Sequence, residues 1–220
     1  MKNFIKKYRH AWLILTYLPI YLVWFFLLER YVTKEYHIIE SPLDAYIPFN
    51  ELFIIPYFLW FPFIAISVLY FIFRDRTECY RLSGLLIVGM TVFLLVSTFY
   101  PNGVALRPVL SELGRNNIFL DMVSGLHKAD TSTNVCPSIH VYNSLAVCFA
   151  FFASPHLKGK YLLKAGILIL TVLICMSTVF LKQHSVIDVF WAFVIMAIAA
   201  PVIYARHLFK RGHRTSTVSE

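Results

Sequence analysis

Six stretches of the chain contain few or no charged residues and are rich in Leu, Ile, Val and Phe. Each approaches the roughly 20 residues that a helix needs to cross a hydrocarbon core about 30 Å thick. Lipid offers no partners to free backbone N–H and C=O groups, so such segments cross as helices. We therefore predict an all-α polytopic membrane protein, a bundle of six transmembrane helices forming one domain over residues 1–220, with spans at about 11–28, 52–73, 82–100, 139–154, 161–181 and 186–205.

The composition supports a membrane location. Hydrophobic residues make up 59% of the chain, charged residues only 15%, and the mean hydropathy is +0.67. These values exclude a soluble enzyme, a nucleic-acid-binding domain and a disordered scaffold. The net charge of +8 comes from Lys and Arg that lie mostly between the apolar stretches, where they orient the chain. We therefore expect no nucleic-acid partner.

The basic residues are divided unequally between the two sides of the predicted bundle. Six spans place both termini on one side, and fourteen of the twenty Lys and Arg residues fall there. The other side holds six: Arg30, Lys34, Arg107, Arg115, Lys128 and Lys182. Because cytoplasmic loops carry the excess of positive charge, we predict cytoplasmic termini in the cell membrane. Loops 29–51, 101–138 and 182–185 then face the extracytoplasmic side.

His184 and Asp188 stand at the start of the last predicted span. Their i, i+4 spacing places them on one helix face, where they can hydrogen-bond. A carboxylate on one imidazole nitrogen fixes the tautomer and makes the other nitrogen more basic, as a nucleophile or base requires. Ionisable residues in membranes are costly and often functional. The alternative is a polar pair that ties two helices together.

A second polar cluster opens the fourth span, where a proline is followed by Ser138, Ile139 and His140. Proline suits a first helical turn, and a helix N-terminus that carries a serine can bind an anion. His140 adds a proton donor there. Simple helix capping is the alternative. Arg107 and Lys182, on the same side, offer charges to a phosphate, or could instead anchor the chain at the membrane interface.

Taken together, these residues resemble the type 2 phosphatidic acid phosphatase superfamily of membrane lipid phosphatases and phosphotransferases. The family pattern is K-x6-R-P, then P-S-G-H, then S-R-x5-H-x3-D, on a six-helix layout. The chain supplies Arg107-Pro108, Pro137-Ser138-Ile139-His140, and Ser177, His184 and Asp188 in the same order.

Three positions depart from that pattern. Tyr100 stands where the family has lysine, Ile139 where it has glycine, and Thr178 where it has arginine. Two phosphate-binding cations are thus missing, and Lys182 is a candidate to replace one of them. Residues 130–140 also resemble the divergent branch that includes inositol phosphorylceramide synthase-like proteins, which contains transferases as well as phosphatases.

The resemblance implies a role for each matching position. His184 would attack phosphorus and form a phosphohistidine, Asp188 would orient and stabilise it, and His140 would protonate the leaving oxygen and then deprotonate the acceptor. The phosphate would be held by Arg107, Ser138, Ile139 and Lys182. The sequence shows no cage of carboxylates for a metal, so we expect a metal-independent reaction without a cofactor.

We therefore predict a membrane lipid phosphatase that hydrolyses a phosphomonoester or diphosphate head group on the outer face. Head-group transfer to an alcohol, as in inositol phosphorylceramide or sphingomyelin synthases, is the alternative within the resemblance. A small transporter, or a structural protein whose polar residues only tie helices together, is the alternative from another class. The expected partners are a phosphorylated lipid and the bilayer itself.

Overall fold

The structure, a computed structural model, describes residues 7–32 and 35–215, with side chains through residue 205. Seven α-helices are found in these ranges: α2 (Trp12–Tyr31), α3 (Ile54–Arg74), α4 (Arg76–Phe99), α5 (Ile118–Ala129), α6 (Ile139–Ala153), α7 (Tyr161–Phe180) and α8 (Val186–Thr215). Short 3₁₀ helices are η1 (Arg9–Ala11), η2 (Pro42–Tyr46), η3 (Glu51–Phe53), η4 (Leu110–Glu112) and η5 (Pro155–Leu157). Strands β1 (His37–Ile38) and β2 (Asn102–Gly103) form one parallel pair.

Five helical segments within the described ranges are long and apolar enough to cross a membrane. They are Arg9–Tyr31, Glu51–Arg74, Arg76–Phe99, Tyr161–Phe180 and Val186–Ala205. The fourth predicted span is α6, which is apolar but has only 15 residues. A helix of that length rises about 22 Å, less than the thickness of a hydrocarbon core. The structure therefore agrees with an all-α membrane protein, whereas six spans and cytoplasmic termini stay predictions.

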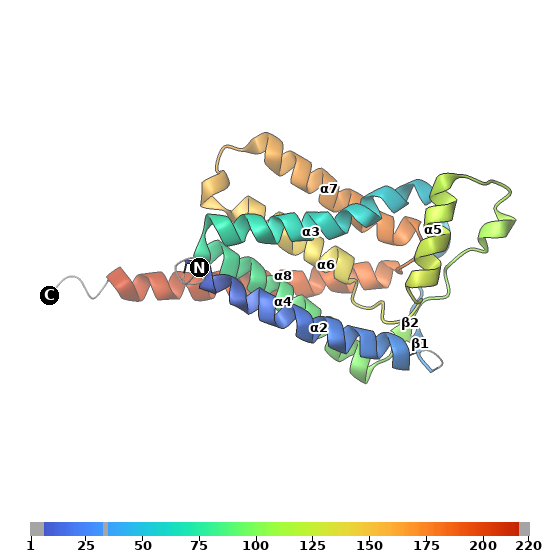
Figure 1. The fold of residues 1–220 in the computed structure, drawn as a ribbon, viewed down its shortest axis with the longest axis horizontal. Helices are drawn as coiled ribbons and strands as arrows, with labels where there is room; N and C mark the ends of the chain where they lie inside the picture. The colour runs from blue at the N-terminus through green and yellow to red at the C-terminus, as the bar shows by residue number, and fades with distance from the viewer. Residues whose placement is uncertain (1–6, 33–34, 216–220) are drawn as a thin grey trace.

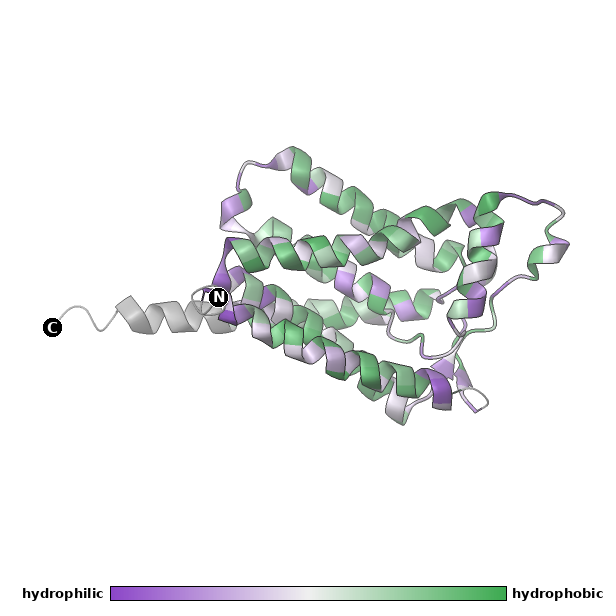
Figure 2. Ribbon diagram, in the orientation of Figure 1, coloured by the Kyte–Doolittle hydropathy of each residue, from purple (hydrophilic) through white to green (hydrophobic). Residues whose placement is uncertain are grey.

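The helices are arranged as a lengthwise bundle with one crosspiece. Figure 1 shows α2, α3, α4, α6, α7 and α8 running along the long axis, while α5 lies across one end. The start of α2 and the end of α8 lie at the opposite end. Hydrophobic residues dominate the long helices and hydrophilic residues gather at both ends of the bundle (Figure 2). This distribution is typical of a protein whose middle is surrounded by lipid.

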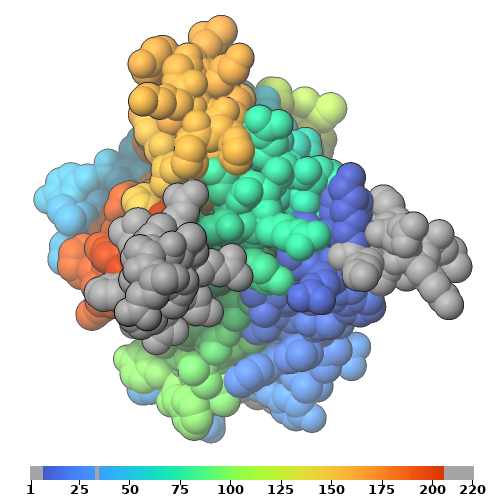
Figure 3. Space-filling view, turned by 90° about the vertical axis from the view of Figure 1, so that its left-hand side faces the viewer, coloured from blue at the N-terminus to red at the C-terminus, as the bar shows by residue number. Residues whose placement is uncertain are grey.

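Helix α6 is the centre of the packing, in contact with α3, α4, α7 and α8. Its Tyr142 ring lies against Gly89 of α4, and the Tyr142 hydroxyl donates to the Leu85 carbonyl over 2.9 Å. A Cβ at position 89 would be 1.9 Å from that ring, so only glycine permits this approach. Figure 3, seen from the end where α2 begins, shows the orange segment at the start of α7 projecting from the bundle, while α7 as a whole packs against α3 and α6.

The predicted outer loop 101–138 contains a helix that we did not predict. Asn117 caps α5, accepting hydrogen bonds from the N–H groups of Phe119 and Leu120 over 3.0 Å each. The apolar face of α5 buries Leu120, Val123 and Leu126. Val123 and Leu126 share a hydrophobic cluster with Ile54 and Tyr57 of α3. Helix α5 therefore covers the end of the bundle where α3 begins.

The other outer segment, residues 35–53, is attached to that same end at several points. Strand β1 pairs with β2, aligning His37 with Asn102. The Glu40 carboxylate accepts from the Ala105 N–H over 2.9 Å, and the Asn50 N–H donates to the Phe180 carbonyl over 3.0 Å. These contacts fix η2 beside the turn that joins α7 to α8.

Candidate active site

His184 lies in the short turn between α7 and α8, and its partner Asp188 is in the first turn of α8. The two are joined by a 3.3 Å contact between His184 Nδ1 and Asp188 Oδ2. The same carboxylate oxygen accepts from the Ser185 N–H over 2.9 Å. Both side chains are buried. A proton on Nδ1 that is donated to Asp188 leaves the lone pair of His184 on Nε2, the form that a nucleophile needs.

His140 lies in the first turn of α6, facing this pair. The centroids of the His140 and His184 rings are 5.8 Å apart. Two aromatic rings of α3 flank His140, Tyr57 at 4.6 Å and Trp60 at 4.4 Å between centroids. His140 Nδ1 has no hydrogen-bond partner among the described residues. The structure therefore brings the two predicted histidines together from helices that are distant in sequence.

Ser138 and Ile139 begin α6 directly beside the start of α8. The fully buried Ser138 hydroxyl accepts from the Val141 N–H over 3.5 Å, which makes it the N-cap of α6. The Ser138 N–H donates to the Asp188 carbonyl over 3.2 Å, joining the two helix ends. Ile139 is buried in the apolar core. No phosphate contact of either residue is described, so their phosphate-binding role stays a prediction.

Asn102, which we did not single out from the sequence, holds the segment that leads to Ser138. Its side-chain oxygen accepts from the N–H groups of Val135 over 3.0 Å and Cys136 over 2.8 Å. The Asn102 carbonyl accepts from the Asn134 N–H over 2.6 Å. Burial and the Asp188 carboxylate together raise the pKa of Cys136 to about 12, so its sulfur stays a thiol.

Arg107 reaches the site, and its guanidinium is extensively hydrogen-bonded. Nη1 donates to the carbonyls of Asp130 over 2.9 Å and His127 over 3.4 Å. Nη2 donates to the Thr131 carbonyl over 2.8 Å and to Gln183 Oε1 over 2.6 Å. Only Nε lacks a partner among the described residues. Arg107 thus binds the end of α5 to the turn that carries His184.

Asp130 is a carboxylate at the site that sequence reasoning gave no role. Its Oδ2 accepts from the Tyr57 hydroxyl over 3.4 Å and lies 3.9 Å from Arg107 Nη2. Burial raises the pKa of Asp130, whereas the positive charge of Arg107 lowers it. The charge of His184 also lowers the pKa of Asp130. Asp130 is therefore close to both the nucleophile candidate and the cation.

Asp44, from η2, is the second carboxylate that the sequence did not identify. Asp44 Oδ2 accepts from the Ser185 hydroxyl over 2.6 Å, and Oδ1 accepts from the Val186 N–H over 2.8 Å. The side chain is 3% exposed. Asp44 therefore caps the N-terminus of α8 from a loop about 140 residues away in the chain.

Lys182 contacts the same loop. Its Nζ donates to the Asp44 carbonyl over 2.6 Å, and its backbone has a left-handed φ of 58°. Burial lowers the pKa of Lys182, against the effect of the nearby Asp44 carboxylate. The ammonium is thus bound to the loop, and its proposed replacement of a missing arginine stays a prediction.

Tyr100 and Thr178, which stand where the family has cations, have no described contact with the side chain of either histidine. The Tyr100 ring stacks on His37 with centroids 4.3 Å apart. The buried Thr178 hydroxyl donates to the Cys175 carbonyl over 2.8 Å. The Thr178 backbone carbonyl accepts from the N–H groups of Gln183 and His184, and so shapes the turn.

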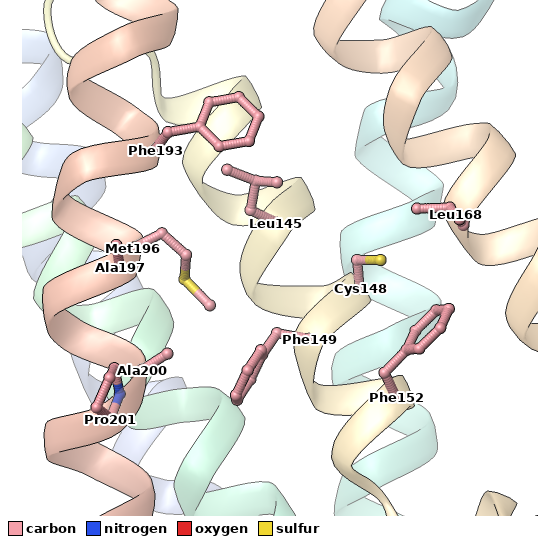
Figure 4. Close-up of a pocket in the computed structure, with 10 residues that line it drawn as sticks. All are labelled: Leu145, Cys148, Phe149, Phe152, Leu168, Phe193, Met196, Ala197, Ala200 and Pro201. Atoms are coloured by element: carbon pink, nitrogen blue, oxygen red, sulfur yellow. The ribbon is translucent and has the colours of Figure 1, made fainter.

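Two apolar grooves lie between the described helices, and neither is lined by His140, His184 or Asp188. One, of about 630 Å³, is lined in part by Cys136, Pro137 and Ile187, which are close in sequence to Ser138 and Asp188. The other, of about 550 Å³, lies deeper in the bundle between α6 and α8, with Leu168 of α7 on its far side (Figure 4). Phe149 and Phe193 project toward this second groove from opposite helices.

The fold and the site define a helical membrane protein with two histidines and a carboxylate at the ends of adjacent helices. The family model described as the PAP2 superfamily matches residues 82–211, more than half of the chain. The chain therefore belongs to the PAP2 superfamily, whose members are generally phosphatases or phosphotransferases. The match includes every site residue predicted from the sequence. No curated protein and no solved structure matches the chain.

Proposed function

We propose that this protein cleaves a phosphate ester of a membrane lipid through a phosphohistidine on His184. The observation that carries the proposal is the arrangement of His184, bound to Asp188 over 3.3 Å, with its ring centroid 5.8 Å from that of His140. A phosphorus atom between the two rings would have a nucleophile on one side and a proton donor on the other. Superfamily membership supports this chemistry.

In the first step His184 Nε2 forms a bond to phosphorus, and the bond from phosphorus to the leaving oxygen breaks. His140 gives that oxygen a proton. In the second step the acceptor oxygen gives its proton to His140 and bonds to phosphorus, while the P–N bond breaks. Asp188 stabilises the charge on the His184 ring, and Arg107, Ser138 and the start of α6 stabilise the phosphoryl oxygens.

The acceptor decides which of two reactions results. With water the protein is a lipid phosphatase acting on a phosphomonoester or diphosphate. With an alcohol it is a head-group phosphotransferase, and the resemblance of residues 130–140 is to a branch that contains both kinds of enzyme. In either case the lipid tail stays among the helices, where the apolar groove lined by Pro137 and Ile187 is available to it. The lower count of basic residues at this end of the bundle supports an extracytoplasmic site.

The direct test is turnover by the purified protein in detergent against a panel of phosphorylated lipids, with and without an alcohol acceptor. We expect His184→Ala to abolish turnover, since no other group replaces the nucleophile. His156→Ala is a matched control, because His156 lies beyond the far end of α6 and contacts Asp75 there at 3.9 Å. Undiminished turnover in His184→Ala would refute the assignment. Turnover should also persist in EDTA if the reaction is metal-independent.

A further inference from the structure

The charges around the two histidines are mostly negative. Four carboxylates of the described residues surround the pair: Asp188 on His184, Asp44 on the neighbouring Ser185, Asp130 on Tyr57, and Glu29 on Thr131 and Asn134. Two cations contact the segments that carry these residues, Arg107 and Lys182. The other described basic residues at this end, Arg30, Arg115 and Lys128, have no described contact with the histidine pair. A phosphate that enters therefore meets more negative than positive side chains.

Both cations already have partners, which limits what they offer. Arg107 gives four hydrogen bonds to three carbonyls and the side chain of Gln183. Lys182 gives its hydrogen bond to the Asp44 carbonyl. A phosphate can therefore bind only to the Nε–H of Arg107 and the remaining N–H groups of Lys182 unless it displaces these contacts, and the gain is smaller than that from a cation with all its donors free.

Of the two helix N-termini at the site, that of α8 offers little positive potential to an anion. The N-terminus of α8 is already capped by the Asp44 carboxylate, which accepts from the Val186 N–H and is buried. A charged cap offsets the positive end of the helix dipole. The N-terminus of α6, capped by the neutral Ser138 hydroxyl, is left to face an anion.

From this balance we propose that the substrate is a lipid phosphodiester, whose phosphate carries one negative charge, and that Asp130 is the residue that excludes a phosphomonoester dianion. The inference rests on the proposed function and narrows its substrate. The extra charge of a dianion, roughly 6 to 12 Å from a carboxylate at an effective dielectric of about 20, would weaken binding about ten- to a hundredfold. A diester avoids that penalty.

Asp130 is the carboxylate in the best position to act in this way. Its side chain is 38% exposed, whereas Asp188 and Asp44 are buried and Glu29 has both oxygens in hydrogen bonds. Asp130 also lies near the proton donor. Its carboxylate accepts a hydrogen bond from the Tyr57 hydroxyl, and the Tyr57 ring stacks on His140. A second negative charge on the phosphate would therefore lie close to Asp130.

The reaction balances with a diester as it does with a monoester. His184 Nε2 bonds to phosphorus, the ester bond to the diacylglycerol oxygen breaks, and His140 protonates that oxygen. The head group stays on the phosphohistidine. The hydroxyl of an acceptor alcohol, or water, then gives its proton to His140 and displaces His184, releasing a new diester or a free head-group phosphate.

The test compares lipids with identical acyl chains in detergent micelles that also contain a long-chain alcohol. Phosphatidate provides the dianion at pH 8, and phosphatidylcholine and phosphatidylglycerol provide diesters. The measurement is release of labelled diacylglycerol by the purified full-length chain. We expect at least one diester to react at least tenfold faster than phosphatidate. Asp130→Asn should reduce that ratio at least tenfold by raising the phosphatidate rate.

Asp121→Asn is the matched control, since Asp121 is an exposed carboxylate on α5, and it should leave the ratio unchanged. If Asp130→Asn does not fold, the wild-type ratio at pH 5.5 replaces it. Phosphatidate then carries mostly one charge, so its rate relative to that of the diesters should rise. A wild-type ratio below ten at pH 8 overturns the diester assignment, while turnover itself still supports the proposed function. An unchanged ratio in folded Asp130→Asn overturns the role of Asp130. No turnover of any lipid and no labelled phosphohistidine would overturn the proposed function itself.

Discussion

Asp44 allows a sharp test of how the nucleophile is positioned. Its carboxylate binds the Ser185 hydroxyl and the Val186 N–H over 2.6 and 2.8 Å, directly after His184 in the chain. The Ser185 N–H in turn binds Asp188, the partner of His184. We predict that Asp44→Ala lets the start of α8 shift, so that His184 and Asp188 lose their alignment.

The magnitude follows from the hydrogen bonds that are lost. Each bond to a charged acceptor contributes about 1.5–3 kcal/mol, and the substitution removes two that hold the start of α8, from the buried Ser185 hydroxyl and the half-buried Val186 N–H, besides one from the Ser41 N–H within the loop. If about half of that free energy is needed to hold the catalytic geometry, the barrier rises by about 1.5–3 kcal/mol. Since each 1.36 kcal/mol is a factor of ten, kcat should fall about ten- to a hundredfold.

The assay is steady-state turnover in detergent, with kcat and KM determined separately. We expect kcat to fall and KM to change less than about threefold, because Asp44 has no described contact with the space between the histidines. Asp44→Asn should retain part of the activity, since one amide oxygen can still accept a hydrogen bond. Leu43→Ala, at an exposed neighbouring side chain, is the control. A kcat within threefold of the wild type in folded Asp44→Ala would refute this reasoning.

Four further predictions concern the site, the orientation and the packing. His140→Ala should slow turnover strongly and let acid-labile phosphohistidine accumulate, which labelled substrate would detect. Normal turnover without any accumulated phosphohistidine would contradict the acid–base role. Lys182→Met should lower catalytic efficiency at least tenfold if the ammonium contributes to phosphate binding, and a near-normal value would leave it as a loop anchor only. A single cysteine at Asn116, in a cysteine-free background, should react with an impermeant reagent in intact cells, whereas labelling only after lysis would reverse the orientation. Gly89→Ala should lower the melting temperature in detergent, since its Cβ would overlap a tyrosine ring, while Gly166→Ala, with open space around it, should not.

The long helices could be predicted because their signal is local. An apolar stretch of sufficient length indicates a span wherever it lies, and five of the six predicted stretches correspond to long apolar helices. Boundaries are harder to predict where charged residues extend a helix. Helix α4 begins at Arg76, six residues before the predicted span, because Asp75 caps it by accepting from the Glu78 N–H over 2.9 Å. Charged residues in its first turns resemble a loop in the sequence.

Helix α5 was missed for a different reason. It has 12 residues and only one apolar face, and its other face carries Asp121, His127 and Lys128, so it is too short and too polar to resemble a membrane span. The signal that was present is the cap at Asn117 followed by Leu120, Val123 and Leu126 at intervals of three. A search for helical periodicity, in place of apolar length, would have found it.

The contacts of the site likewise include some that the sequence could predict and some that it could not. The contact between His184 and Asp188 could be predicted, because four residues on a helix bring two side chains together. Asp44, Asn102 and Asp130 could not, since their partners are 141, 34 and 73 residues away. Such contacts depend on how loops fold over the end of the bundle. Nothing in the local pattern around these residues distinguishes them from ordinary loop residues.

Arg107 shows why the residue type alone does not determine a role. Its presence before a proline was correctly noticed, and the structure does bring it to the turn that carries His184. Yet its donors bind the carbonyls at the end of α5, which any buried arginine can do in place of binding phosphate. Phosphate binding at this residue must therefore use the unpartnered Nε, or displace a carbonyl and loosen α5. In the second case substrate binding and the position of α5 are coupled, because the same guanidinium cannot satisfy both with the same N–H groups.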